Sequence, residues 1–159
     1  MTTRVGFGFD VHPFVEGDPA GRVLILGGVV FPGERPLVGH SDADVVAHAV
    51  GDAILGAAGL GDLGMHFPDS DDRWRGADSL SILAACCDLA STNGFHLVNA
   101  DCTILTERPK IAPVREEMMK RLREVAGAPV HVKATRPEGL GSLGRVEGIA
   151  CMAVALLET

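Results

Sequence analysis

The chain has 159 residues, of which 47% are hydrophobic and 22% charged, and its formal net charge is −7. These values predict one domain with a sizeable core, exclude disorder, and leave no apolar run near the roughly 20 residues of a membrane-spanning helix. With 14 Lys+Arg against 21 Asp+Glu, no Tyr and one Trp, the chain is a poor candidate for nucleic-acid binding. It can still bind an anionic substrate if metal ions supply positive charge.

The first part of the chain predicts a strand, a hairpin and a helix. Apolar residues alternate with glycines over 5–10, which is the period of a strand, and the glycines leave one face nearly bare for close packing or binding. Two short apolar runs over 23–31 flank Gly27-Gly28, which indicates a tight hairpin. Ser41 and Asp44 are spaced like a capping box, with Asp in place of Glu, ahead of a helix to about Ala58.

The second part alternates helices and strands. Residues 59–72 are rich in Gly, Asp and Pro and predict a loop. The expected elements that follow are a helix over 78–93, a strand over 97–106, a helix opened by Pro109 and continuing through 115–124, a strand over 130–135 and a glycine-rich loop over 139–144. The apolar segment 148–157 has no clear period, so helix and buried strand both stay open. This order favours one α+β or mixed α/β domain over 1–159.

One carboxylate and two histidines form a candidate metal site. In Asp10-Val11-His12, which ends the first strand, residues i and i+2 point the same way and can converge on one point. His48, one turn into the first helix, would complete a set of two His and one carboxylate with an open position, as in catalytic zinc sites. The alternative is a turn histidine at His12 and an ordinary surface or core histidine at His48.

Polar residues around His48 extend this candidate site. Asp44 and Asp52 each lie four residues from His48, and either could accept the second imidazole N–H. We interpret Asp44 as a charge favouring the helix start and Asp52 as the partner of His48. His40 and Ser41 could offer an imidazole and a hydroxyl to a phosphate near the helix N-terminus, although Ser41 could equally be only a helix cap.

Two loops match the pattern G-x-G-x-x-G without its required context. The match at Gly59 follows a helix, and the match at Gly139 leaves too few residues for a βαβ unit, so neither is a dinucleotide site. Their backbone N–H groups could still cradle phosphate. The loops also carry polar residues that are usually only solvated but could hold a divalent ion or contact phosphate: Asp62, Asp69, Asp71, Glu138 and Arg145, with Lys110 after the central strand.

The cysteines and the N-terminus bear on the compartment. Cys86, Cys87, Cys102 and Cys151 form no C-x-x-C pair, so we expect buried thiols rather than disulfides or a thiolate metal site. The chain starts with one Arg and then strand-like residues, unlike a signal or transit peptide, and we expect a cytoplasmic protein.

In their order along nearly the whole chain, the motifs resemble the 2-C-methyl-D-erythritol 2,4-cyclodiphosphate synthase family of the non-mevalonate isoprenoid pathway. The residues that carry the resemblance are 6–12 (GFGFDVH), 39–44 (GHSDAD) with His48, 61–64 (GDLG), 67–69 (FPD), 109–110 (PK), 132–135 (VKAT) and 144–148 (GRVEG). The resemblance implies a single α+β domain, with a mixed β-sheet and helices packed on one face, that assembles as a homotrimer. It also makes the last segment a strand.

The resemblance implies roles for particular residues. Asp10, His12 and His48 would hold one zinc ion per subunit, and Glu138 would hold a second divalent ion, Mg²⁺ or Mn²⁺, through the substrate diphosphate. His40 would steady the phosphate under attack. Asp62 would bind the methylerythritol hydroxyls, Thr106 to Ala112 would form the cytidine pocket, and the loop from Thr135 to Glu138 would reach across from a neighbouring subunit. We expect substrate contacts also from Ser41, Leu63, Gly64, Phe67, Pro68, Asp69, Ser70, Asp71, Pro109, Lys110, Ile111, Ser142 and Arg145.

The implied reaction is an intramolecular cyclisation. The 2-phosphate of 4-diphosphocytidyl-2-C-methyl-D-erythritol 2-phosphate attacks the β-phosphorus, CMP leaves, and the cyclic diphosphate forms. Positioning and charge neutralisation suffice for this chemistry, because the substrate supplies its own nucleophile. The alternatives are a zinc phosphohydrolase, in which water attacks, and a trimeric cytidine-nucleotide-binding module without turnover.

The chain departs from the family pattern at two places. It has Thr135-Arg136-Pro137-Glu138 where the family usually reads Thr-Thr-Thr-Glu, and we take Arg136 as a catalytic contact in place of the middle Thr. Pro137 removes a backbone N–H from that loop. Ser142-Leu143 replaces the usual Phe-Thr beside the threefold axis, which disfavours prenyl-diphosphate binding there, while Arg145 is retained.

Overall fold

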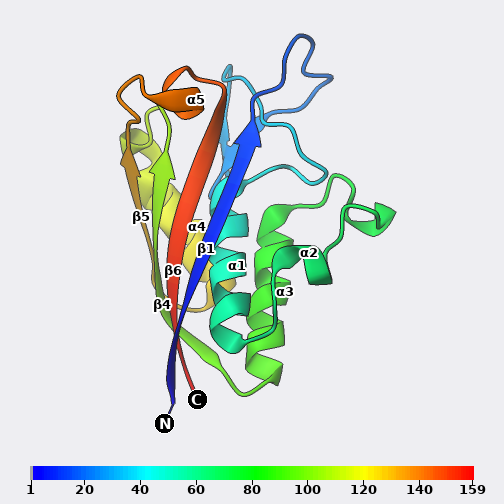
Figure 1. The fold of residues 1–159 in the computed structure, drawn as a ribbon, viewed down its shortest axis with the longest axis vertical. Coiled ribbons are helices and arrows are strands. Elements are labelled where there is room, and N and C mark those ends of the chain that lie inside the picture. Colours follow the sequence, from blue (N-terminus) through cyan, green and yellow to red (C-terminus); the bar gives the residue numbers. More distant parts are fainter. Residues whose placement is uncertain (1) are drawn as a thin grey trace.

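The computed structural model describes residues 2–159 as an α+β fold with one mixed sheet covered by helices on one face (Figure 1). The sheet has the order β1-β6-β4-β5, with β1/β6 and β6/β4 antiparallel and β4/β5 parallel. Its strands are β1 Thr3–Pro13, β4 His96–Leu105, β5 Val130–Thr135 and β6 Gly148–Glu158, and a separate hairpin joins β2 Leu24–Leu26 to β3 Val29–Phe31. The last segment, open between helix and strand from its pattern, is therefore a strand.

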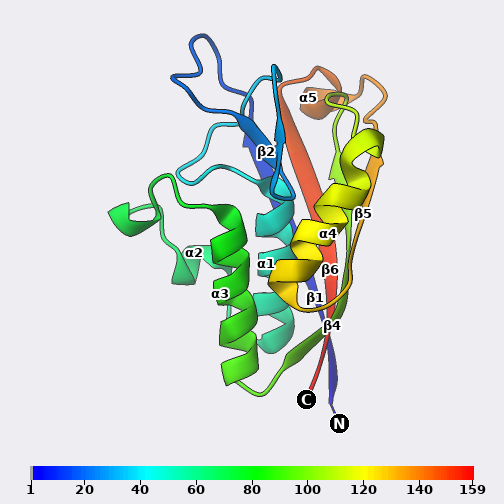
Figure 2. The same cartoon turned by 180° about the vertical axis from the view of Figure 1, so that it is seen from behind.

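Three longer helices, α1 Val45–Ala58, α3 Ser79–Thr92 and α4 Arg115–Ala126, lie on the same side of the sheet, as the reverse view in Figure 2 shows. α1 packs on β1 and β6, and α3 packs against α1. The shorter elements are α2 Leu63–His66, α5 Gly141–Gly144 and the single 3₁₀ turns Asp72–Trp74 and Ala112–Val114. Fully buried side chains such as Ile54, Leu83, Ile104 and Leu122 fill the space between these layers. Within residues 2–159, no helix is long and apolar enough to cross a membrane.

The glycine face of β1 is where α1 approaches the sheet most closely. A Cβ placed on Gly6 would lie 2.0 Å from the Ala53 carbonyl oxygen, and one on Gly8 would lie 2.0 Å from the Ala49 carbonyl oxygen. No side chain larger than hydrogen fits there, so the expectation of close packing on the bare face is confirmed. The alternate residues of β1, including Phe7, point to the other side of the sheet and are exposed.

Three expectations about local structure need correction. Ser41 is not the cap of α1: the cap is Asp44, whose carboxylate accepts hydrogen bonds from the Val46 and Ala47 N–H groups. Pro109 does not open the third helix, because the chain makes a 3₁₀ turn first and α4 begins only at Arg115. The glycine-rich loop over 139–144 contains the short helix α5. The Gly27-Gly28 turn is confirmed, since both residues have a positive φ, 57° and 73°.

We expect Gly8→Ala to lower the free energy of unfolding by about 3 kcal/mol or more, because its methyl group would overlap the backbone of α1. Gly56→Ala is the matched control: it lies within α1, and the nearest atom to its added Cβ would be 3.9 Å away. Gly56→Ala should be neutral or stabilise by up to about 1 kcal/mol through helix propensity. Urea unfolding of both variants gives the comparison, and a Gly8→Ala protein as stable as wild type would contradict the close approach.

Candidate metal centre

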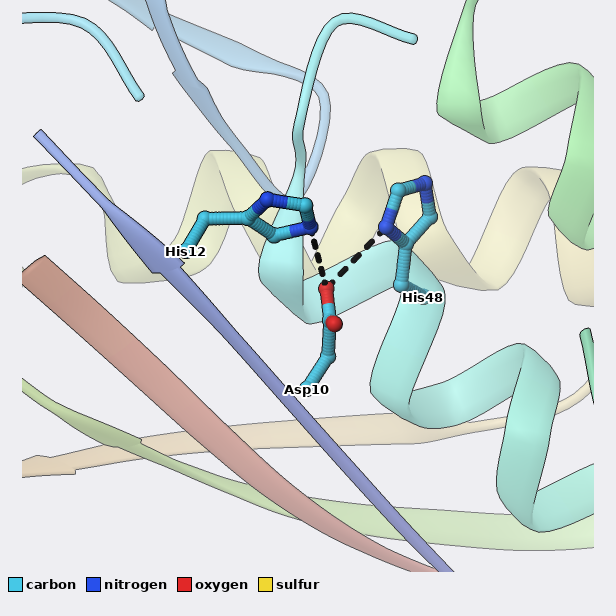
Figure 3. Close-up of side chains that lie close together, drawn as sticks. All are labelled: Asp10, His12 and His48. Carbon is cyan, nitrogen blue, oxygen red and sulfur yellow. Dashed lines mark hydrogen bonds and ion pairs between the residues drawn. The ribbon is translucent and has the colours of Figure 1, made fainter. Parts of the chain in front are cut away.

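The end of β1 and the first turns of α1 bring three potential metal ligands together (Figure 3). Asp10 and His12 project from the same face of β1 because they are two residues apart on an extended strand. Asp10 Oδ2 lies 3.1 Å from His12 Nε2 and 3.0 Å from His48 Nδ1. The close packing of α1 on the glycines of β1 brings His48 within reach of the strand.

The electrostatics of these three residues favour a charged Asp10. Burial alone would raise the pKa of Asp10, but hydrogen bonds from His12 and His48, with their positive charge, outweigh it and hold that pKa at about 2. For His12, burial acts to lower the pKa, and the hydrogen bond and charge of Asp10 raise it overall. The carboxylate is thus ionised, as a metal ligand has to be.

The donor set fits a divalent metal ion. One carboxylate oxygen and two imidazole nitrogens lie within 4.8 Å of one another, a combination suited to zinc and similar ions, and a fourth position is left for another ligand. His12 Nδ1 lies 2.6 Å from the Val38 carbonyl oxygen. Because a carbonyl only accepts hydrogen bonds, Nδ1 carries the proton, and Nε2 is the nitrogen available to a metal.

The three residues line a cavity of about 430 Å³. Other residues around it that the sequence predicts as site residues are His40, Ser41, Leu63, Gly64, Phe67 and Asp69. His40 Nε2 is buried and, among the residues that the structure describes, has no hydrogen-bond partner. The cavity therefore combines a metal-binding set with an unpaired imidazole nitrogen.

Residues 3–158 match the model of the YgbB family. The chain belongs to this family. It is 56% identical over 158 residues to a "2-C-methyl-D-erythritol 2,4-cyclodiphosphate synthase" of Geobacillus kaustophilus (strain HTA426), which covers 98% of each chain. The resemblance drawn from the sequence motifs is confirmed.

Solved structures of the family share the fold. A structure described as "2C-Methyl-D-erythritol-2,4-cyclodiphosphate Synthase (bound form CDP)" superposes with a TM-score of 0.86 at 35% identity, over 98% of this chain and all of that one. The bifunctional IspDF from Campylobacter jejuni superposes with a TM-score of 0.91 at 38% identity. That superposition covers 98% of this chain but only 42% of the bifunctional chain.

A second group of predicted site residues lies toward the other edge of the sheet. Residues 106–112 follow β4 and residues 135–138 follow β5, whereas Asp10 and His12 are on β1. Only β6 lies between β1 and β4, and both β6 and β4 lie between β1 and β5, so β4 and β5 are about 10 Å and about 14 Å from β1. Lys110 and Glu138 are exposed, and neither lines the cavity around Asp10. Within one chain, the two groups of predicted site residues are not joined.

The loop after β5 is tied to Glu107. Arg136 Nε donates to Glu107 Oε2 at 3.0 Å, and the Gly139 N–H donates to Oε1 at 2.9 Å. The Gly139 hydrogen bond first, and then Arg136, lower the pKa of Glu107. The Arg136 side chain is thus engaged by its own chain, and Arg145 Nε similarly donates to Glu147, at 2.7 Å.

The remaining predicted residues flank these two regions without joining them. Asp62 caps the short helix α2 by accepting from the Met65 N–H, and Asp71 pairs with Arg73. Thr106 is buried, and its hydroxyl donates to the Arg108 carbonyl. Several further predicted site residues do not line the metal-centre cavity: Pro68, Ser70, Pro109, Ile111, Ala112, Thr135 and Ser142.

The prediction that Asp52 is the hydrogen-bond partner of His48 is wrong. Asp52 Oδ1 accepts from the Leu63 N–H at 3.2 Å and so supports the start of α2. His48 instead turns toward β1 and α3, where its Nε2 lies 2.8 Å from the Ser79 hydroxyl. Asp44, which was interpreted as a charge at the helix start, is the cap of α1 and also accepts from the Gly27 and Gly28 N–H groups of the hairpin.

Sequence reasoning missed two contributors to this site, Ser79 and the Val38 carbonyl, and it also missed the pairing of Glu107 with Arg136. Ser79 is the first residue of α3 and lies 31 residues from His48, so no helical or strand period connects the two. A backbone carbonyl such as that of Val38 carries no sequence signal at all. Glu107 lies within the run Thr106 to Ala112 that was predicted as the cytidine pocket, and its charge opposite that of Arg136 was the one available sign of the pair.

Proposed function

We propose that this chain converts 4-diphosphocytidyl-2-C-methyl-D-erythritol 2-phosphate to 2-C-methyl-D-erythritol 2,4-cyclodiphosphate and CMP, as an enzyme of non-mevalonate isoprenoid biosynthesis. The observation that carries the proposal is the Asp10, His12 and His48 set, beside a cavity, in a chain that aligns along 98% of its length with a synthase of that name. A CDP-bound relative of the same fold supports a cytidine-nucleotide substrate.

In the proposed reaction the substrate supplies its own nucleophile. The 2-phosphate attacks the β-phosphorus of the diphosphate, the bond to CMP breaks, and an eight-membered ring closes. The protein has to hold the two phosphates in line and offset their negative charge, which positioning and electrostatic groups achieve without a covalent intermediate. Release of CMP with ring closure makes the enzyme a phosphorus–oxygen lyase.

Two metal ions offset the charge in this proposal. Asp10, His12 and His48 would hold one zinc ion per subunit, and Glu138 would hold Mg²⁺ or Mn²⁺ together with the substrate diphosphate. Such ions polarise phosphoryl oxygens and stabilise the charge that develops on them. The net charge of −7 is then compatible with an anionic substrate.

Several side chains would orient the substrate. His40, whose buried Nε2 lacks a partner in the described part of the chain, would donate to the phosphate under attack, and Ser41 lines the same cavity. Asp62 would bind the methylerythritol hydroxyls. Arg136 would contact a substrate phosphate after leaving the Glu107 carboxylate, to which it donates a hydrogen bond. Glu107 and the phosphate would therefore compete for Arg136, unlike for the usual Thr of the family. The other proposed contacts are Leu63, Gly64, Phe67, Pro68, Asp69, Ser70, Asp71, the run Thr106 to Ala112 with Lys110, Thr135, Ser142 and Arg145.

We further propose that three copies of the chain form a homotrimer in the cytoplasm, with each active site between two subunits. The separation of the metal centre from residues 106–112 and 135–138 within one chain supports a site completed by a neighbour. The sheet face opposite the helices carries a row of exposed apolar side chains that a subunit interface would cover: Val5, Phe7, Phe9 and Val11 of β1 with Met152 and Val154 of β6. The free thiol state of all four cysteines fits a reducing compartment.

Phosphorus NMR of the substrate incubated with the protein, zinc and Mg²⁺ tests the reaction. We expect two coupled cyclic-diphosphate resonances to grow beside CMP. His12→Ala and His48→Ala should each lower turnover by at least about 100-fold, because each removes a metal ligand. Full activity of either variant would contradict the metal assignment.

The other products separate the remaining functions. Open-chain phosphates would show that water is the nucleophile and that the chain is a phosphohydrolase. Tight CMP binding without any product, in metal-replete protein, would identify a binding module. If the chain binds CMP without turnover and the double variant Arg136→Thr/Pro137→Thr restores turnover, the loop after β5 is the cause of the lost activity.

Sedimentation of Phe7→Asp tests the proposed interface. A charge on this exposed row of β1 should convert a trimer to monomers, because the interface would bury the carboxylate without a partner. Val30→Asp, at a similarly exposed position on the hairpin strand β3, is the control and should stay trimeric. A trimeric Phe7→Asp protein, or monomeric wild type, would contradict the proposed interface.

A further inference from the structure

We propose that Ser79 and Asp42 are positioning residues that hold the His48 ring in the one tautomer that leaves Nδ1 free to bind a metal. The inference rests on the metal centre of the proposed function. It adds two residues from outside the ligand set, which reach His48 from the side opposite Asp10.

The three side chains form a continuous hydrogen-bonded row. His48 Nε2 lies 2.8 Å from Ser79 Oγ, and the Ser79 hydroxyl also hydrogen-bonds to Asp42 Oδ1. The Ser79 backbone N–H donates to the other oxygen of Asp42, Oδ2, at 3.1 Å. Ser79 is only 1% exposed, so water does not compete for its hydroxyl. Both the backbone and the side chain of Ser79 are therefore bound to a single carboxylate.

The direction of each hydrogen bond follows from the groups involved. An ionised carboxylate only accepts, so the Ser79 hydroxyl proton points to Asp42. With its proton committed, Ser79 Oγ offers only lone pairs to His48 Nε2, and Nε2 has to carry a proton to complete the bond. With Nε2 fixed as a protonated nitrogen, Nδ1, which lies 3.0 Å from Asp10 Oδ2, is the nitrogen that gives up its proton when a metal binds.

This arrangement matches the one around His12. There, the Val38 carbonyl accepts a hydrogen bond from the Nδ1–H, and Nε2 faces Asp10. For His48 the roles of the two ring nitrogens are reversed: Nε2 donates to Ser79, which Asp42 orients, and Nδ1 faces Asp10. The outer hydrogen bonds thus direct one nitrogen of each ring toward the same carboxylate oxygen of Asp10.

Local structure explains how Ser79 comes to this position. Asp78 caps α3 by accepting from the Leu80 N–H, which makes Ser79 the first residue of the helix. The Asp42 N–H donates to the Ala77 carbonyl at 3.1 Å, so the segment before α1 and the start of α3 are joined by backbone as well. A purely structural role of Asp42 and Ser79 in this junction is the alternative that a test has to separate.

Ser41 is the other hydroxyl near the ring and a weaker candidate for the same role. Its Oγ lies 3.3 Å from His48 Nε2 and 3.4 Å from Ser79 Oγ, both longer than the contact that Ser79 makes. It also accepts a hydrogen bond from the Ala43 N–H. Loss of Ser79 is therefore not fully replaced by Ser41.

Zinc affinity of the whole protein, measured by competition with a chromophoric chelator and without substrate, tests the inference. Ser79→Ala should bind zinc about 10- to 100-fold more weakly than wild type, the usual effect of losing an outer hydrogen bond to a ligand. Ser79→Thr keeps the hydroxyl and should bind close to wild type. Ser81→Ala, which removes an exposed hydroxyl of α3 that bonds to Asp78, is the control and should be unchanged.

The histidine ring ¹⁵N shifts of a metal-free Asp10→Ala protein, which lacks the carboxylate that competes for the Nδ1 proton, provide a readout that a structural role does not move. In that background the neutral His48 ring should carry its proton on Nε2. Asp42→Asn lets the Ser79 hydroxyl turn and donate to Nε2, so it should shift the proton toward Nδ1 even if the fold is unchanged. That shift would support a positioning role whether or not Ser79→Ala is less stable.

Two results would overturn the inference. One is a folded Ser79→Ala protein with wild-type zinc affinity, and the other is a His48 ring that keeps its tautomer in both Ser79→Ala and Asp42→Asn. If the wild type binds zinc and either result is obtained, the proposed metal centre is retained and only the positioning role of Ser79 and Asp42 is rejected. Failure of the wild type to bind zinc would overturn the metal centre as well.

Discussion

The approach of α1 to the glycine face of β1 is the constraint on which the rest of the structure depends. With side chains on Gly6 and Gly8 the helix could not lie against the strand, because their Cβ atoms would meet the Ala53 and Ala49 carbonyl oxygens at 2.0 Å. The same face of β1 ends in Asp10 and His12, so the helix that covers the glycines also carries His48 to the two ligands. The contact between α1 and β1 therefore both packs the core and brings the three potential metal ligands together.

The residues proposed for the reaction lie in two groups within one chain. Asp10, His12, His48 and His40 border one cavity, while the residues after β4 and β5 follow strands that are separated from β1 by one and by two strands. Glu107 holds the second group in place through Arg136 and the Gly139 N–H. An exposed apolar sheet face on the side without helices is consistent with the proposal that neighbouring copies bring the two groups together.

Sequence patterns predicted Asp10, His12 and His48 as potential metal ligands because strand geometry alone brings residues 10 and 12 to one side, and His48 lies in the first predicted helix. They failed for Asp52, since the spacing of four residues describes neighbours on a helix surface, whereas the His48 ring turns toward β1 and α3. Ser79 has no periodic relation to His48. The residue pattern of the final strand left helix and strand open, because one of its faces is buried under α1 while the other carries exposed Met152 and Val154, which leaves no polar alternation. The family resemblance alone made it a strand.

X-ray absorption at the zinc edge of the zinc-loaded protein tests most directly whether packing of α1 on β1 creates a metal centre from Asp10, His12 and His48. The account predicts a first shell of nitrogen and oxygen only, with the multiple scattering of two imidazoles. A sulfur neighbour at about 2.3 Å would contradict it by assigning the metal to cysteine. So would a spectrum that is unchanged in His48→Ala.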